Sequence, residues 1–145
     1  LLRTAISNAT QITPDTVMIL NTIGELFQVY SLATIAFCGG SLVPLGGQNP
    51  LEPAFWGKPV FYGPSMEDFL DAKELLEAVG AGIPVQDAGE LERGVLALLQ
   101  DEVALVRRGQ AGREILQKQQ GSSERTLLLA KKLLPKHPVV NGRLN

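Results

Sequence analysis

Four acidic side chains in this sequence each stand three residues after a side chain that can begin a helix. The pairs are Thr22 with Glu25, Asn49 with Glu52, Ser65 with Asp68, and Asp87 with Glu90. At this spacing the two side chains can close a capping box, in which each accepts a hydrogen bond from a backbone N–H group at the helix start. A carboxylate at the mouth of a sheet can instead accept hydrogen bonds from sugar hydroxyls, as acidic residues do with ribose in dinucleotide sites. We expect capping boxes at Ser65 and Asp87, and both roles stay open at Thr22 and Asn49.

The glycine content around Asn49 favours a ligand site there. The stretch GGSLVPLGGQNPLE, residues 39–52, places Gly39, Gly40, Gly46 and Gly47 before a helix start in which Pro50 suits the first helical position. Glycines let backbone N–H groups approach a ligand closely, and a helix N-terminus favours phosphate. The loop matches neither G-x-G-x-x-G nor G-x-x-x-x-G-K-[ST], which argues against a standard dehydrogenase or P-loop NTPase. The pattern predicts a nucleotide or nucleotide-sugar site, with a purely structural turn as the alternative.

Strand-like and helix-like segments alternate along the chain and would position these residues. The expected strands are 16–20, 34–39, 59–63 and 82–86, and the expected helices are 24–33, 49–57, 66–80, 89–100 and 101–134, the last with a break near 120–125. This alternation predicts an α/β fold, a Rossmann-like parallel sheet with flanking helices. The strands are continuously apolar, which indicates burial on both faces. Doubly wound domains commonly have about six strands, and the chain does not open with Met, so we expect residues 1–145 to be part of one domain of a longer protein.

Composition excludes several classes of protein. The 13 Lys and Arg against 15 Asp and Glu show no basic stripe with interleaved aromatic residues, which argues against nucleic acid as a partner. No apolar run approaches the roughly 20 residues of a membrane span. The one cysteine, Cys38, lies in an apolar run and is expected to be buried in a protein of a reducing, cytoplasmic compartment. The one histidine, His137, has no clustered partner for a metal site or a catalytic triad.

Four motifs occur together between residues 23 and 69: IGEL, FxGGSLV, GGxNPLEPA and GPxMExF. On these motifs the sequence resembles the 3-deoxy-D-manno-octulosonic acid (Kdo) transferases of lipopolysaccharide synthesis. The resemblance implies the C-terminal half of a GT-B glycosyltransferase, which binds the donor CMP-Kdo. It also implies an inverting transfer that needs no metal or other cofactor. The N-terminal domain, with the membrane anchor, the lipid A precursor site and the catalytic carboxylate, is expected to be absent, so no catalytic residue is assigned and the chain alone is expected to be inactive. The full protein is expected at the cytoplasmic face of the bacterial inner membrane.

The same resemblance implies which residues contact the donor. Two stretches are expected to contact CMP: Ile23, Gly24 and Glu25, and Asn49, Pro50, Leu51 and Glu52. Backbone N–H groups around Gly39, Gly40 and Ser41 are expected to stabilise the leaving phosphate. The sequence departs from many relatives at Leu45, Gln48 and Ser65, where basic residues or histidines are common. Glu25 and Glu52 are expected to converge on a common rim.

Two other functions remain open from the residues alone. A GT-B transferase or epimerase that uses a UDP-sugar would share the ribose-binding carboxylate but need a different base pocket. A non-catalytic α/β interaction module would use the capping boxes and glycines only for structure.

Overall fold

The computed structural model describes residues 1–7 and 10–119, and its centre is a three-stranded parallel sheet. The strands β1 (Ala36–Phe37), β2 (Val60–Tyr62) and β3 (Gly82–Pro84) lie in the order β1-β2-β3. Ala36 pairs with Val60, and Val60 pairs with Gly82. The predicted α/β class with a parallel sheet is confirmed, and three of the four expected strands form in the expected places.

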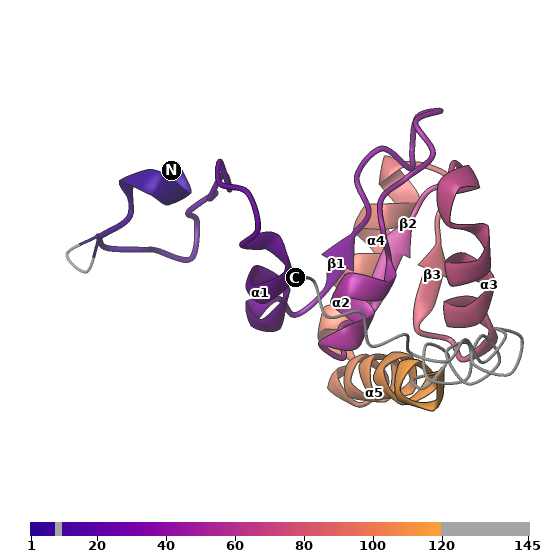
Figure 1. Ribbon diagram of the computed structural model, residues 1–145. Helices are drawn as coiled ribbons and strands as arrows, with labels where there is room; N and C mark the ends of the chain where they lie inside the picture. Colours follow the sequence, from indigo (N-terminus) through magenta and orange to yellow (C-terminus); the bar gives the residue numbers. More distant parts are fainter. Residues whose placement is uncertain (8–9, 120–145) are drawn as a thin grey trace, which may run out of the picture.

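Helices cover both faces of the sheet (Figure 1). They are α2 (Leu51–Phe55), α3 (Leu70–Ala78), α4 (Ala88–Gln100) and α5 (Glu102–Gln119), with α1 (Leu26–Val29) beside α2. Short 3₁₀ turns are η1 (Arg3–Ala5), η2 (Tyr30–Leu32) and η3 (Glu67–Phe69). The expected helix 24–33 therefore forms as α1 with η2, and the expected helix 66–80 forms as η3 with α3. The break near 120–125, the last helix to 134 and His137 lie outside the described residues.

The central strand β2 divides the core into two layers. Val60 and Tyr62 pack on one side with residues of α2, α3 and the second half of α5, whereas Phe61 packs on the other side with Leu98 of α4. All three β2 residues are buried. A strand that is apolar at successive positions can fill both layers, so the prediction of burial on both faces is confirmed for β2.

The first expected strand, residues 16–20, is not formed, and that prediction is wrong. Ile19 makes a single bridge to Leu2, and Val17 is 76% exposed. Figure 1 shows the N-terminal segment extending away from the sheet, on the side of β1. A strand needs a neighbouring strand for its backbone hydrogen bonds. Because this segment bonds to residues 1–3 instead of β1, its apolar side chains stay in solvent.

Candidate functional site

The carboxyl ends of β1 and β2 lead into the loops that carry the predicted site. In an open parallel sheet, ligands bind outside this edge. The loop after β1 runs from Cys38 to Pro50 and contains the glycine-rich stretch, and α2 follows it directly. The helix starts at Glu25 and Asn49 are therefore the places to compare with the prediction.

Asn49 lies two residues before α2, and Glu52 does not complete a capping box with it. The Asn49 Oδ1 accepts a hydrogen bond from the Leu51 N–H at 3.1 Å. The Asn49 Nδ2 donates to Glu52 Oε1 at 3.4 Å. In a capping box the Glu52 carboxylate would accept from the backbone N–H of Asn49, but here it accepts from the Asn49 side chain. The half-buried Glu52 keeps Oε2 without a hydrogen-bond partner among the described residues. It is thus able to accept hydrogen bonds from a ligand.

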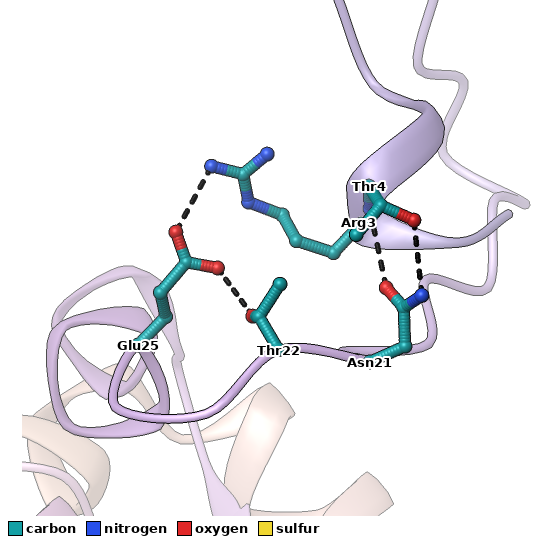
Figure 2. A network of polar contacts seen from close by, with 5 residues as sticks. All are labelled: Arg3, Thr4, Asn21, Thr22 and Glu25. Carbon is teal, nitrogen blue, oxygen red and sulfur yellow. Dashed lines mark hydrogen bonds and ion pairs between the residues drawn. The ribbon is translucent and has the colours of Figure 1, made fainter.

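Glu25 also closes no capping box, because both of its oxygens are occupied by side chains (Figure 2). Glu25 Oε1 lies 3.2 Å from Nη2 of Arg3 in an ion pair, and Oε2 accepts a hydrogen bond from the Thr22 hydroxyl. Close by, Thr4 and Asn21 exchange two hydrogen bonds of 3.2 and 2.9 Å. These contacts tie η1 to the start of α1. Sequence reasoning missed Arg3, because no local pattern links it to a residue 22 positions away.

Helix α1, which directly follows Glu25, and helix α2, which carries Glu52, touch through aromatic side chains. The ring centroid of Phe27 in α1 lies 5.2 Å from that of Phe55 and 5.5 Å from that of Trp56, next to α2. Tyr30, in η2, has its pKa raised by burial first and then by the charges of Cys38 and Glu52. The helix that carries Glu52, α2, also contacts η2, the turn that follows α1.

The two carboxylates do not share the hollow in which Glu25 lies. That hollow, of about 510 Å³, is lined by Arg3, Gly24, Glu25, Gln28, Val29 and Leu32, without Glu52. Ile23, the first residue of the stretch Ile23, Gly24 and Glu25, is fully exposed. Convergence of Glu25 and Glu52 on one ligand stays a prediction.

The first part of the glycine loop is open to a ligand. Gly39 is exposed, and a Cβ added there would meet nothing within 4 Å. The N–H groups of Gly39 and Gly40 donate to no described residue. Ser41 differs, because its fully buried hydroxyl donates to Cys38 O at 2.6 Å and accepts from the Gly63 N–H at 2.8 Å. Its side chain therefore joins the ends of β1 and β2, and the contact of its backbone N–H with phosphate stays a prediction.

The second part of the glycine loop is held by the residues after β2. Ser65 accepts a hydrogen bond from the Gly46 N–H at 2.9 Å and donates to Glu67 Oε2 at 2.7 Å. The expected capping box of Ser65 with Asp68 is therefore wrong, because the serine hydroxyl is taken by a loop 19 residues away. Of the residues that replace commoner basic ones, Leu45 is 71% exposed and Gln48 is exposed, whereas Ser65 is 7% exposed.

Of the expected capping box at Asp87, the capping of α4 by the Asp87 side chain is confirmed, whereas Glu90 reaches the N–H of Gln86, one residue before the cap. The Glu90 N–H donates to Asp87 Oδ1 at 2.8 Å, and Glu90 Oε2 accepts from the Gln86 N–H at 2.8 Å. These carboxylates satisfy the helix start, which is the structural role expected for this pair.

Neither a metal site nor a membrane span is found in the part of the chain that the structure describes. Within residues 1–7 and 10–119, no group of three or more His, Cys, Asp or Glu side chains could hold a metal ion. None of the helices there combines the length and apolar character that crossing a membrane requires.

The fold defines a class of protein: an α/β domain with a Rossmann-like parallel sheet and flanking helices. This is the fold of the C-terminal half of a GT-B glycosyltransferase. No family model matches the sequence. The described fold is similar to the crystal structure of the C-terminal CMP-Kdo binding domain of WaaA from Acinetobacter baumannii. That match has a TM-score of 0.65 and 31% identity, and it covers 69% of this chain and 52% of that one.

Curated relatives agree with this match. The 3-deoxy-D-manno-octulosonic acid transferase of Haemophilus influenzae is 38% identical over 122 residues, 83% of this chain. That of Aquifex aeolicus is 42% identical over 83 residues, 57% of this chain. The matched part spans 29% and 24% of the length of these two relatives. The chain is therefore related to the family of 3-deoxy-D-manno-octulosonic acid transferases, as the sequence motifs predicted.

Proposed function

We propose that this chain is the donor-binding domain of a glycosyltransferase that moves Kdo from CMP-Kdo to a lipid A precursor. The main support for this proposal is the similarity to the CMP-Kdo binding domain of WaaA, because the two proteins share both a fold and 31% sequence identity. The curated transferases support it independently through the sequence. The chain spans only part of these relatives, so the activity proposed is that of a full-length transferase.

The proposed roles of the residues follow from their chemistry. Glu52, with a carboxylate oxygen that has no described partner, accepts hydrogen bonds from the ribose hydroxyls. The free N–H groups of Gly39 and Gly40 and the start of α2 face the phosphate and stabilise its charge as it leaves. Ile23, Gly24 and Glu25 form the second contact stretch, in which Glu25 exchanges Arg3 or Thr22 for the nucleotide.

The proposed reaction is an inverting transfer without a metal ion. A hydroxyl of the lipid A precursor, deprotonated by a carboxylate outside this chain, attacks the anomeric carbon of Kdo while the bond to CMP breaks. This domain contributes the binding of CMP and the stabilisation of the leaving phosphate, and it transfers no Kdo by itself. The acceptor is bound by the N-terminal domain of the full-length transferase, which acts at the cytoplasmic face of the bacterial inner membrane.

Calorimetric titration of the 145-residue chain with CMP and with UMP tests the proposal. Cytosine presents an amino donor where uracil presents a carbonyl acceptor, so a cytidylate site discriminates between them. We expect saturable CMP binding and at least about tenfold weaker UMP binding, which corresponds to about 1.4 kcal/mol. Equal affinities would favour a UDP-sugar enzyme, and binding of neither nucleotide at millimolar concentration would contradict a donor site on this chain.

A further inference from the structure

The turn after β2 is hydrogen-bonded to the glycine loop after β1 at one residue of that loop, Gly46. The Gly46 N–H donates to Ser65 Oγ at 2.9 Å, and the Asp68 N–H donates to Gly46 O at 3.4 Å. Both backbone polar groups of Gly46 are therefore satisfied by the segment 65–68. Ser65 is 7% exposed, so water competes little for its hydrogen bond.

The two segments are packed without space between them. Gly46 and Gly47 have φ of +76° and +78°, which favours glycine. A Cβ on Gly46 would overlap the Asp68 carboxylate, and a Cβ on Gly47 would overlap Sδ of Met66. The loop therefore has little room to move relative to the turn.

The proton of the Ser65 hydroxyl is directed by Glu67. Ser65 has one proton to donate and gives it to Glu67 Oε2 at 2.7 Å, which leaves a lone pair for the Gly46 N–H. This hydrogen bond lowers the pKa of Glu67, so its carboxylate is ionised and accepts the proton at neutral pH. Glu67 itself is exposed, so it orients Ser65 without being part of the core.

Gly47 lies two residues before Asn49, whose Oδ1 accepts a hydrogen bond from the N–H of Leu51, the first residue of α2. The position of Gly46 and Gly47 therefore affects where α2 starts. We propose that Ser65 is a positioning residue for the donor site: through its hydrogen bond to Gly46 it holds the glycine loop so that Asn49 and Glu52 face the nucleotide. This inference rests on the proposed function for its ligand, whereas the hydrogen bond that carries it can be measured without any ligand.

The experiment uses Ser65→Ala in the 145-residue chain, with Asp101→Ala as a matched control. Asp101 Oδ1 accepts the Ala104 N–H at 2.9 Å at the start of α5, so its loss removes one hydrogen bond far along the chain from the loop. Amide hydrogen exchange at Gly46 and CMP affinity are measured for both variants. We expect Gly46 exchange about tenfold faster, and CMP binding about three- to tenfold weaker, in Ser65→Ala only.

A second pair of variants changes the same hydrogen-bonded contact at Glu67, which is exposed and lies outside the core. Glu67→Ala leaves the Ser65 proton without its acceptor and should weaken CMP binding about two- to threefold, whereas Glu67→Gln keeps a carbonyl acceptor and should restore it. If Gly46 exchange in Ser65→Ala equals that of the control, the hydrogen bond does not hold the loop and the inference is overturned. If exchange rises while CMP affinity stays unchanged, the positioning role is overturned. If the unmodified chain binds no CMP, the proposed function fails, while the exchange data still decide whether Ser65 holds the loop.

Discussion

Arg3 and Glu25 form an ion pair, with 3.2 Å between Nη2 and Oε1, that joins the N-terminal turn to the start of α1. The side chains are 39% and 41% exposed, so water and salt weaken their attraction. The pair occupies a carboxylate that the sequence motifs assign to the nucleotide. In the proposed donor site Glu25 would have to exchange partners to contact the nucleotide, whereas Glu52 has an oxygen already available.

Arg3→Gln should change stability little. Half-exposed ion pairs contribute about 1 kcal/mol or less, so we expect the free energy of unfolding to fall by less than about 1 kcal/mol. Urea denaturation at low and high salt measures the change, and the difference between variant and parent should shrink at high salt. A loss above about 2 kcal/mol would show that the N-terminal segment is held more firmly than its exposure indicates.

Glu52→Gln separates a structural from a ligand-binding carboxylate. A glutamine can still accept the hydrogen bond from Asn49 Nδ2, so the free energy of unfolding should change by only about 0.5 kcal/mol. A ribose contact would lose its charge-assisted hydrogen bonds and about 1.5–3 kcal/mol of binding. Titration with CMP, with exposed Glu74→Gln in α3 as control, measures the loss. Unchanged affinity would rule out the hydroxyl-acceptor role.

Substitution of Gly46 should lower stability, whereas substitution of Gly39 should weaken CMP binding and leave stability nearly unchanged. Gly46→Ala forces a side chain into a positive φ and against Asp68, which should cost about 1–2 kcal/mol or more of stability. Gly39→Ala meets nothing within 4 Å, so stability should stay within about 0.5 kcal/mol while CMP binding weakens, because the Cβ obstructs close approach of the phosphate. Thermal unfolding and titration test both. A stable Gly39→Ala variant with parental affinity would remove Gly39 from the site.

Cys38 should be unreactive in the folded protein. Burial raises the pKa of its thiol from 9.0 to about 12, and the thiolate is the reactive form. At pH 8 a thiol reagent should modify Cys38 only after urea is added. Rapid labelling without urea would contradict the burial of this thiol.

The same pKa shift predicts a loss of stability in alkali. Because the thiol of the unfolded chain releases its proton near pH 9 and the folded one near 12, the folded state holds more protons between these values. The contribution to stability is complete below about pH 9 and is lost as pH rises toward 12. In Cys38→Ala, stability measured over this range should therefore fall less steeply than in the parent. Equal slopes would exclude Cys38 as a contributor.

Patterns that depend on neighbouring residues were predicted correctly. The strand at Val60–Tyr62 follows from a short apolar run between turn residues. Gly57 and Gly80, the last residues of the expected helices 49–57 and 66–80, follow α2 and α3 with positive φ. Asp87 caps α4 through an N–H three residues away. Each of these features is determined within one turn of helix or one strand length, which a sequence displays directly.

Patterns that depend on distant partners were predicted incorrectly or not at all. Thr16–Leu20 has the composition of a strand but no strand beside it. Ser65 has the spacing of a cap, yet its hydroxyl serves Gly46. In both cases the local pattern was present and a contact far along the chain, or its absence, decided the outcome.

The sequence by itself determined the order of strands and helices, the place of the glycine loop and the relation to the Kdo transferases, because apolar runs, capping residues and motifs are local properties. Only the tertiary structure decided which polar atoms the chain already uses. It pairs Glu25 with Arg3, buries the Ser41 hydroxyl and leaves Glu52 with an available oxygen. The physical reason is that hydrogen-bond partners are chosen by proximity in space, and chain folding brings together groups whose separation in sequence gives no sign of contact.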